Sequence, residues 1–487
     1  MKISGATHRT GSAVDDPKPR ADARLDHEVC YQAVRRRDRR FDGRFYTAVK
    51  TTGIFCRPSC PARTPASRNV TFYAHAAGAI DAGFRPCRRC RPELAPAHPE
   101  WNRRADLASR AVSLIEQGIV DREGVTGLAS RLGVSERHLR RELIAEVGTG
   151  PYQLAQVRRL WLARALLDQT TLSITDVAFA AGFSSIRQFN DAFSKAFATT
   201  PSEVRRRPSR SDGDRNRRTV TLHLPARGPL RWDLLGPFLA ARAIPGLESS
   251  EGDTFRRNVD GGWVELTGTG DTLVVTCALA ELGGLSQLLP TIRIVADLDT
   301  DLDAVAEQLA TDPLLARLVD GAVDGVPRLP GTFDRFELAV RSVVGQQVSV
   351  AGARSTLGKL LDLVGPGPHN RFPSPDELLS APLDRLGMPQ QRRETIVRLA
   401  RTVAEGQVDL SPEADPLATE SRLLDIKGIG PWTAGYITMR AFSHPDGWPA
   451  GDLIVARRTG LSGPELEARA EHWRPWRAYA ALALWAA

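Results

Sequence analysis

The sequence predicts a chain of several domains that together belong to the α+β class. At 487 residues, with 42% hydrophobic residues, the chain exceeds what one core usually covers and can build several. Apolar residues follow a helical period from Trp101 to about Arg206, alternate with a period of two after Thr219, and become helical again from Asp301. Four cysteines spaced C-x3-C-x26-C-x2-C near the N-terminus indicate a separate small metal domain.

These changes of period set the expected boundaries. The expected segments are a disordered tail (1–20), a small zinc-bound α/β domain (21–97), an all-α double helix-turn-helix domain (101–206), an arginine-rich linker (207–218), a small antiparallel sheet domain (219–300) and an all-α helix-hairpin-helix domain (301–487). The linker lies in the run RRRPSRSDGDRNRR, which has no apolar residue to pack. Its charge adds nonspecific DNA affinity, or it is only a soluble tether.

The predicted metal ligands are two close pairs of cysteines, Cys56 with Cys60 and Cys87 with Cys90. Zinc prefers four thiolates in a tetrahedron, and two pairs joined by a loop can close around one ion. The alternatives are a redox pair or two disulfides, but no signal peptide and no βαβ pattern accompanies the cysteines. The basic neighbours favour thiolates and attract phosphate: Arg57, Arg63, Arg85, Arg88, Arg89 and Arg91.

The sequences around these cysteines, FYTAVKTTGIFCRPSC and FRPCRRCRPE, resemble the N-terminal domain of the Ada adaptive-response proteins. The resemblance implies that all four cysteines hold one zinc ion and that Cys56 takes a methyl group from a methylated DNA phosphate. Zinc would keep the thiol deprotonated for this attack. Methylation removes about one negative charge, so we expect DNA affinity to rise. The P-C-H-R motif of two-activity Ada proteins is absent, and O6-methylguanine repair is not expected.

Two helix-turn-helix units are expected, from Val125 to Leu143 and from Ile174 to Phe197. Gly133 and Gly182 would make the turns, Ser135 would cap the second helix of the first unit, and Ser184 or Ser185 that of the second. The candidate DNA-contacting residues are Glu136, Arg137, His138 and Arg140, and Ser185, Arg187, Gln188 and Asn190. The segment AAGFSS...FNDAFSKAF...TPSEVR resembles AraC-family regulators. The alternative is a helical bundle with a solvated arginine face.

Beyond the linker, the segments TVTLHLPARGPL, FRRNV, GWVELTGTG and DTLVVTCAL alternate as strands do, with a helical stretch near Trp232 to Ala243. They predict a small antiparallel sheet with helices. Cys277 lies in one of these strands and is expected to be a buried thiol.

The segment LLDIKGIGPWTAGYITMR, from Leu423 to Arg440, predicts a helix-hairpin-helix with Pro431 opening the second helix. Its glycines would allow a DNA phosphate to approach the backbone amides, so Gly428, Ile429 and Gly430 are expected to contact phosphate. Hairpins of this kind alone are ordinary nonspecific DNA grips, so this element does not by itself imply catalysis.

Downstream, GDLIVAR resembles the HhH-GPD glycosylases, and FELAVRSVVGQQVSVAGA with HWRPWRAYAALALW resembles the AlkA alkyl-base glycosylases. The resemblance begins near Val220. It implies that Asp452 is the catalytic carboxylate, and that Trp432, Tyr436 and Trp485 line the base pocket. Gln347 occupies the position where relatives often wedge an apolar side chain into DNA. The alternatives are that Asp452 only caps a helix, and that Trp432, Trp485, Trp473 and Trp476 are core residues.

The implied chemistry suits these residue types. A methylated purine carries positive charge and leaves easily once it is flipped against aromatic faces, while one carboxylate stabilises the sugar cation or orients water. Trp432 stands where bifunctional relatives carry a lysine, so strand cleavage is not expected. The last cysteine is Cys277, so no iron-sulfur cluster is expected.

The sequence thus predicts a fused alkylation-response protein. Methylation of Cys56 would activate sequence-specific transcription regulation, while a monofunctional DNA-3-methyladenine glycosylase would hydrolyse the N-glycosidic bond of alkylated bases. Its net charge of +8 suits an acidic partner, expected to be double-stranded DNA, both promoter and alkylated, with RNA polymerase as a further candidate. No membrane helix is expected, and we place the chain in the cytoplasm with the nucleoid. The alternatives are a regulator with an inert C-terminal DNA grip, and an enzyme whose N-terminal half only targets it to damage.

Overall fold

The computed structural model describes residues 25–92, 107–205, 219–319, 325–365 and 371–487. The expected tail at 1–20 and linker at 207–218 lie outside the described residues.

The N-terminal part is a small sheet with two helices, in strand order β3-β1-β2-β4. Its elements are α1 (His27–Arg36), β1 (Tyr46–Val49), β2 (Ile54–Cys56), β3 (Val70–Tyr73), α2 (Ala76–Asp81) and β4 (Arg85–Pro86). Cys56 ends β2, and Cys87 directly follows β4, which runs parallel to β2. The Cys87 amide donates to the Phe55 carbonyl at 2.9 Å. Strand pairing therefore brings the two cysteine pairs to one edge of the sheet.

Helices alone form the next described segment, residues 107–205. They are α3 (Leu107–Glu116), α4 (Ile119–Arg131), α5 (Glu136–Val147), α6 (Pro151–Gln169), α7 (Ile174–Ala180), α8 (Ile186–Phe197) and α9 (Pro201–Arg205). Gly124, at φ 69°, interrupts α4, so its helical C-terminal part begins at Val125 as predicted. The Ser135 and Ser185 hydroxyls cap α5 and α8, accepting from the amides of His138 and Gln188 at 3.2 Å each. The double helix-turn-helix prediction is thereby confirmed.

The predicted antiparallel sheet is also present, in strand order β5-β9-β8-β7-β6. Its elements are β5 (Thr219–Pro225), α10 (Trp232–Arg242), β6 (Glu248–Glu251), β7 (Thr254–Val259), β8 (Gly262–Thr269), β9 (Thr272–Leu279) and α11 (Leu285–Val295). Cys277 is buried in β9 as predicted, and burial raises the pKa of its thiol to about 12. The edge strand β6 was not predicted, because its sequence ESSE shows no alternation.

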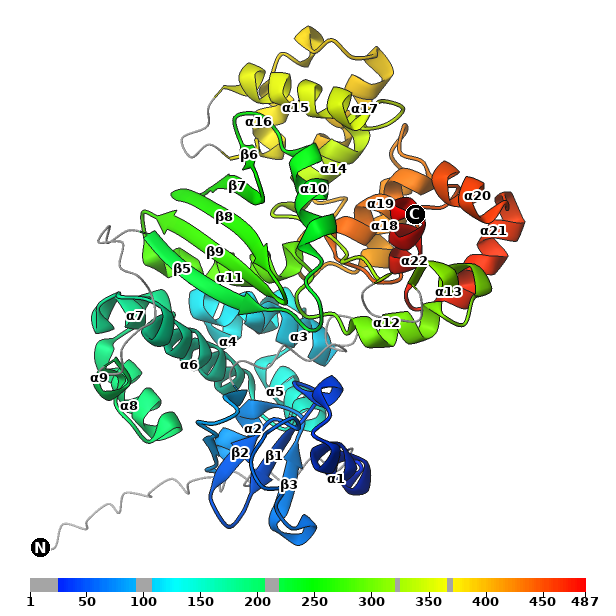
Figure 1. The fold of residues 1–487 in the computed structure, drawn as a ribbon. Coiled ribbons are helices and arrows are strands. Elements are labelled where there is room, and N and C mark those ends of the chain that lie inside the picture. Colours follow the sequence, from blue (N-terminus) through cyan, green and yellow to red (C-terminus); the bar gives the residue numbers. More distant parts are fainter. Residues whose placement is uncertain (1–24, 93–106, 206–218, 320–324, 366–370) are drawn as a thin grey trace, which may run out of the picture.

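The described remainder is helical and forms two groups around separate cores. One group contains α14 (Arg335–Val344), α15 (Val350–Val364), α16 (Pro375–Ser380), α17 (Gln390–Ala404), α18 (Pro416–Leu424) and α19 (Pro431–Ala441). The other contains α12 (Leu302–Leu309), α13 (Pro313–Val319), α20 (Leu453–Thr459), α21 (Gly463–Ala470) and α22 (Arg477–Ala486). Figure 1 shows α14 to α17 above the green sheet, and α20 to α22 to its right. Among the described helices, none is both long and apolar enough to cross a membrane.

The parts of the chain pack directly on one another. One hydrophobic core joins α6 to α9 with the five-stranded sheet, and another joins β1, β2 and α2 with α3 to α6. Polar contacts reach further: Arg44 forms an ion pair with Asp301 at 2.5 Å, and the buried Arg227 donates through Nη2 to the Asp42 carbonyl at 2.7 Å. Figure 1 shows the blue N-terminal sheet and the green sheet at opposite ends of the cyan helices.

Candidate methyl-acceptor and base-excision sites

The four predicted zinc ligands come together. The sulfur atoms of Cys56, Cys60, Cys87 and Cys90 all lie within 4.8 Å of one another. A zinc ion bound at about 2.3 Å from each sulfur needs edges of roughly 3.8 Å, so the cluster fits one tetrahedral ion with little movement. Cys90 is buried and Cys56 is half-buried. Hydrogen bonding with Cys56 lowers the pKa of the Cys60 thiol to about 7.

The loop between Cys56 and Cys60 is anchored by Asp42. Ser59 donates to the Asp42 carboxylate through its amide at 3.0 Å and through its hydroxyl at 2.6 Å. Arg57 lies 3.5 Å from the same carboxylate, and Arg91 forms an ion pair with Asp168 of α6. Two of the six predicted basic neighbours are therefore held within the protein.

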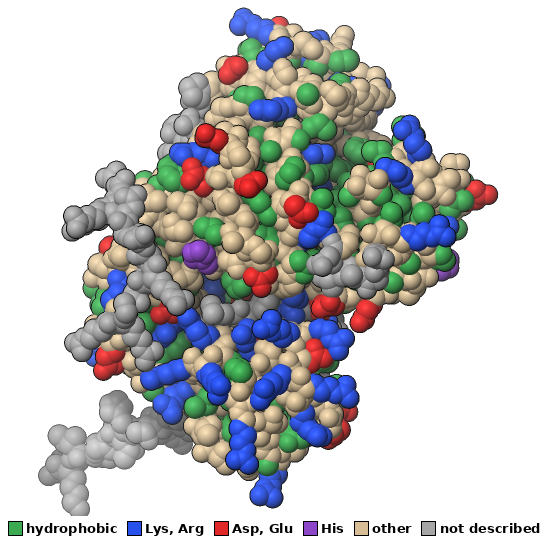
Figure 2. Space-filling view, viewed as in Figure 1, with side chains coloured by type: hydrophobic (Ala, Val, Ile, Leu, Met, Phe, Trp, Pro, Cys, Tyr) green, Lys and Arg blue, Asp and Glu red, His purple; other side chains and the backbone are tan. Residues whose placement is uncertain are grey.

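The remaining four arginines around the cysteines are exposed: Arg63, Arg85, Arg88 and Arg89. Figure 2 shows Lys and Arg side chains gathered over the lower part of the molecule, where the N-terminal sheet lies in Figure 1. The half-buried Cys56 thus belongs to a region of positive surface, which suits a polyanion.

The predicted base-contacting residues lie on the outer faces of α5 and α8. Glu136, Arg137, Arg140, Ser185, Arg187 and Asn190 are exposed, and His138 and Gln188 are half-buried. His138 meets Arg141, with Nδ1 2.7 Å from Nη2, and Gln188 donates to the Tyr152 hydroxyl at 3.3 Å. The Ser185 hydroxyl accepts the capping hydrogen bond, while the Arg187 side chain is 93% exposed.

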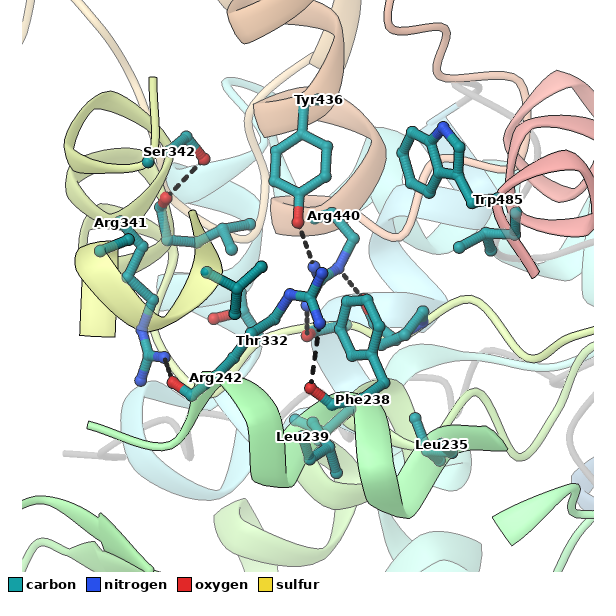
Figure 3. Close-up of a pocket in the computed structure, with 18 of the residues that line it drawn as sticks. Leu235, Phe238, Leu239, Arg242, Thr332, Arg341, Ser342, Tyr436, Arg440 and Trp485 are labelled. Atoms are coloured by element: carbon teal, nitrogen blue, oxygen red, sulfur yellow. Dashed lines mark hydrogen bonds between the residues drawn. The ribbon is translucent and has the colours of Figure 1, made fainter. Parts of the chain in front are cut away.

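A cavity of ≈ 670 Å³ brings together the four residues predicted for base excision: Trp432, Tyr436, Asp452 and Trp485. Trp432 and Tyr436 are one turn apart on α19, and their rings stack at 5.1 Å with an interplanar angle of 7°. Tyr436 and Trp485 lie 6.2 Å apart, and Figure 3 shows them in the same cavity. Trp473 and Trp476 are instead core residues, 1% and 4% exposed.

The Asp452 carboxylate is held by four hydrogen bonds. Oδ1 accepts from the amides of Ile454 and Val455 at 2.9 Å each and from the Trp485 indole at 3.0 Å. Oδ2 accepts from the Trp432 indole at 2.7 Å. Asp452 is thus a helix cap, as the alternative proposed, and also lines the cavity between two aromatic walls. A fixed carboxylate in such a place can stabilise a positive charge.

The hairpin before α19 also has the predicted shape. Gly428 has φ 102°. Gly430 is the N-cap of α19 and has no side chain to accept hydrogen bonds from the first backbone amides of that helix. The side chain of Ile429 is buried and its amide donates to the Ile426 carbonyl at 2.9 Å. Gly428 and Gly430 are exposed and present the backbone to solvent.

Gln347 lies on the loop between α14 and α15. It is exposed and adopts a left-handed backbone, with φ 53°. The preceding Gln346 donates to the Gly428 carbonyl and the Thr433 hydroxyl, each at 3.0 Å. This loop and the hairpin are therefore held together.

The cavity residues that were not predicted include Phe238 and Arg242 of α10, and Arg440 of α19. A helix over residues 232–243 was expected, but its local pattern gives no sign that it meets a hairpin almost two hundred residues later. Arg440 closes the hairpin segment and looks from sequence like an ordinary basic residue near a helix end.

Three family models match parts of the chain. The metal binding domain of Ada matches residues 29–93, a helix-turn-helix domain matches 128–207, and the AlkA N-terminal domain matches 221–334. These matches agree with the cysteine cluster, the capped helix pairs and the five-stranded sheet.

Individual proteins are similar to the same parts of the chain. DNA-3-methyladenine glycosylase 2 of Escherichia coli is 30% identical over 268 residues, 53% of this chain and 94% of that protein. The E. coli bifunctional transcriptional activator/DNA repair enzyme Ada is 41% identical over 170 residues, 34% of this chain and 47% of that protein.

The probable bifunctional transcriptional activator/DNA repair enzyme AlkA of Mycobacterium tuberculosis is 42% identical over 478 residues, 94% of this chain and 96% of that protein. Because this match runs through the cysteine cluster, the paired helix-turn-helix units and the cavity alike, the chain belongs to the family of bifunctional transcriptional activator/DNA repair enzymes AlkA.

Proposed function

We propose that the chain combines a single-turnover methyl transfer to Cys56 with hydrolysis of the N-glycosidic bond of alkylated bases at Asp452. Membership of the AlkA family and the likeness to Ada and to a DNA-3-methyladenine glycosylase support both activities. The observation that carries the enzymatic half is the Asp452 carboxylate, which two indole groups hold at an aromatic cavity. The proposal also divides the chain into six segments, at residues 1–20, 21–97, 101–206, 207–218, 219–300 and 301–487.

In the N-terminal half, Cys56 attacks the methyl carbon of a methylated DNA phosphate, and the phosphate oxygen leaves with the bonding electrons. A zinc ion bound by the four cysteines would supply the thiolate at neutral pH. Arg63, Arg85, Arg88 and Arg89 attract the backbone. The thioether formed carries no charge, so about one negative charge disappears from the cluster and repulsion of DNA falls. The helices α5 and α8 then hold promoter DNA more tightly, which activates transcription.

In the C-terminal half, the exposed glycines of the hairpin hold the backbone while the damaged base enters the cavity. Trp432, Tyr436 and Trp485 offer aromatic faces to a base such as 3-methyladenine. As the glycosidic bond breaks, the Asp452 carboxylate stabilises the cationic sugar or orients the water that attacks it. Because Trp432 occupies the lysine position of bifunctional relatives, the enzyme is monofunctional.

The partners that follow are double-stranded DNA, both promoter and alkylated, and RNA polymerase at the promoter. We place the protein in the cytoplasm, with the nucleoid. Gln347 lies beside the hairpin, where it would enter the space left by a flipped base.

One reaction mixture tests both halves. Wild-type protein, Cys56→Ser and Asp452→Asn are incubated with methylated duplex DNA, while released base is measured and mass spectrometry follows the Cys56 peptide. We expect Asp452→Asn to lose base release but keep methylation of Cys56, and Cys56→Ser to show the reverse. Absence of base release by wild type would instead support a regulator with an inert DNA grip.

A further inference from the structure

The end of the cavity formed by α10 carries positive charge that no carboxylate balances. The guanidiniums of Arg242 and Arg440 both lie against the ring of Phe238, with Cζ 3.7 Å and 4.8 Å from its centroid. Among the described residues, no carboxylate lies within ion-pair distance of either one. Arg440 is satisfied by neutral oxygens, donating to the Tyr436 hydroxyl at 2.6 Å and to the carbonyls of Pro330 and Gly331.

Arg242 is held less tightly. Its hydrogen bond from Nη1 to the Phe238 carbonyl is long, at 3.3 Å, and its guanidinium also meets the Tyr436 hydroxyl. A guanidinium has five N–H donors, and these two contacts leave the others unused. The residue is only half-buried and lines the cavity. Figure 3 shows its guanidinium between Phe238 and the hydroxyl end of Tyr436. Donor groups of Arg242 therefore remain available to a molecule that enters the cavity.

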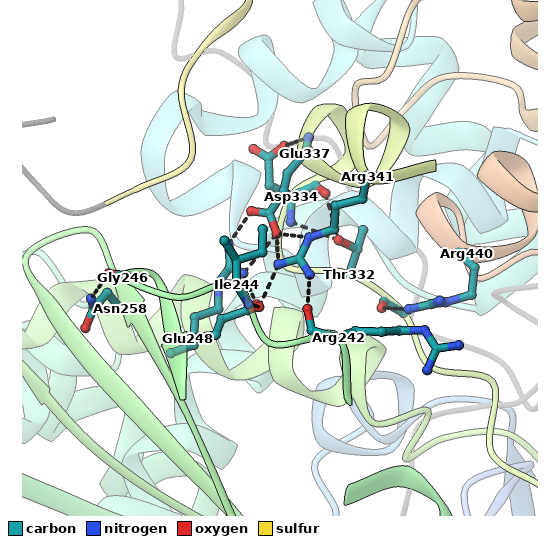
Figure 4. Close-up of polar contacts among 12 residues, drawn as sticks. Arg242, Ile244, Gly246, Glu248, Asn258, Thr332, Asp334, Glu337, Arg341 and Arg440 are labelled. Carbon is teal, nitrogen blue, oxygen red and sulfur yellow. Dashed lines mark hydrogen bonds and ion pairs between the residues drawn. The ribbon is translucent and has the colours of Figure 1, made fainter. Parts of the chain in front are cut away.

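The backbone that carries Arg242 is firmly held by a cluster of four paired charges, Glu248, Arg257, Glu337 and Arg341. Figure 4 shows Glu248, Glu337 and Arg341 beside the Arg242 backbone. Arg341 donates through Nη1 to the Arg242 carbonyl at 2.9 Å. Glu248 accepts from the Ile244 amide at 2.9 Å. The paired charges of this cluster fix the end of α10, and they leave the Arg242 side chain directed to the cavity.

The cavity is therefore polarised. Tyr436 connects its two ends, since its ring stacks on Trp432, which binds Asp452, and its hydroxyl meets Arg440. A nucleotide with its sugar at Asp452 would direct the far edge of its base toward the guanidiniums. Cations there disfavour a positively charged base and favour one with a carbonyl oxygen or ring nitrogen on that edge.

We propose that Arg242 is a specificity-determining residue, which binds acceptor atoms of the flipped base and stabilises neutral bases as they leave. This inference rests on the proposed glycosylase function. When the bond from C1′ to nitrogen breaks, its electron pair stays on the base. A cationic methylated purine becomes neutral, so it has no negative charge to stabilise. A neutral base instead becomes an anion until it takes a proton from water. Water adds to C1′ and its second proton goes to solvent, so the products are free base and sugar hydroxyl.

The test compares two duplexes that differ only in the lesion, a cationic 7-methylguanine or a neutral hypoxanthine, under single-turnover conditions. The proteins are wild type, Arg242→Gln, Arg242→Lys and the control Arg354→Gln, which removes an exposed arginine from the rim of the same cavity. We expect Arg242→Gln to slow hypoxanthine release about tenfold or more and to leave 7-methylguanine release unchanged or faster. Arg242→Lys should retain part of the hypoxanthine rate, and the control should affect release of the two lesions equally.

Equal losses on both lesions in Arg242→Gln would overturn the inference, because they would indicate a structural role. So would release of 7-methylguanine but not hypoxanthine by wild type. Failure of wild type to release either base would refute the glycosylase function itself, and so can be told apart from failure of the Arg242 inference.

Discussion

Replacing Gly428 with alanine tests why the hairpin needs glycine there. The reason is either the backbone conformation of the hairpin or the close approach of a DNA phosphate. Gly428 has φ 102°, a left-handed conformation that costs an alanine about 1–2 kcal/mol. Its Cβ would lie 2.0 Å from Oγ1 of Thr395 and 3.1 Å from that residue's Cβ and Cγ2. Thr395 is 1% exposed, and its hydroxyl donates to the Gln391 carbonyl at 2.9 Å within α17. It cannot swing away freely, so overpacking adds about 1–3 kcal/mol.

We therefore expect Gly428→Ala to lose about 2–5 kcal/mol of unfolding free energy. Gly430 is the matched control, since it has an ordinary φ of −98° and no heavy atom within 4 Å of an added Cβ. Gly430→Ala should change stability by less than about 0.5 kcal/mol, yet weaken DNA binding if phosphate approaches this backbone.

Chemical denaturation followed by tryptophan fluorescence, together with fluorescence anisotropy of a labelled duplex, measures both effects. Adding Thr395→Ala should recover part of the stability lost in Gly428→Ala. A wild-type denaturation midpoint for Gly428→Ala would refute the steric reasoning. Wild-type DNA affinity for Gly430→Ala would refute the phosphate contact.

Three further outcomes are expected. Purified protein should hold one zinc ion per chain by elemental analysis, and Cys90→Ser should lose it, because that thiol is one of four clustered sulfurs. Asp312 also caps a helix and accepts from an indole, Trp473, at 2.8 Å, but lies outside the cavity, so Asp312→Asn should destabilise the protein yet retain the base release that Asp452→Asn loses. Burial opposes ionisation of Asp312, but hydrogen bonds from Arg469 and Trp473 lower its pKa to about 2. Its contribution to stability is therefore present above about pH 4 and lost as pH falls toward 2, and acid denaturation of Asp312→Asn should lack that loss.

The sequence predicted features that depend on a few neighbouring residues. The turns at Gly133 and Gly182 and the caps at Ser135 and Ser185 are encoded within short segments, and the structure has them all. The clustering of the four cysteines was also predicted, because two close pairs of cysteines joined by a loop are typical of a zinc site.

Features that depend on distant contacts were not predicted. Phe238 and Arg242 reach the cavity only because α10 packs beside α15 and the sheet. Arg91 was expected to attract phosphate, but it pairs with Asp168, which lies 77 residues later in the sequence. Such pairings follow from tertiary packing, and the spacing of residues along the sequence does not predict them.

The core shared by α6 to α9 and the five-stranded sheet makes the two halves of this chain difficult to separate into independent genes. Leu166 and Phe193 on one side and Leu222 and Val264 on the other are fully or almost fully buried in that one core. Fragments produced by division within residues 207–218 would each expose apolar surface that the other covers. Coexpressed, they should assemble as a noncovalent pair, so a split form of this protein would persist as a heterodimer and not as two free domains.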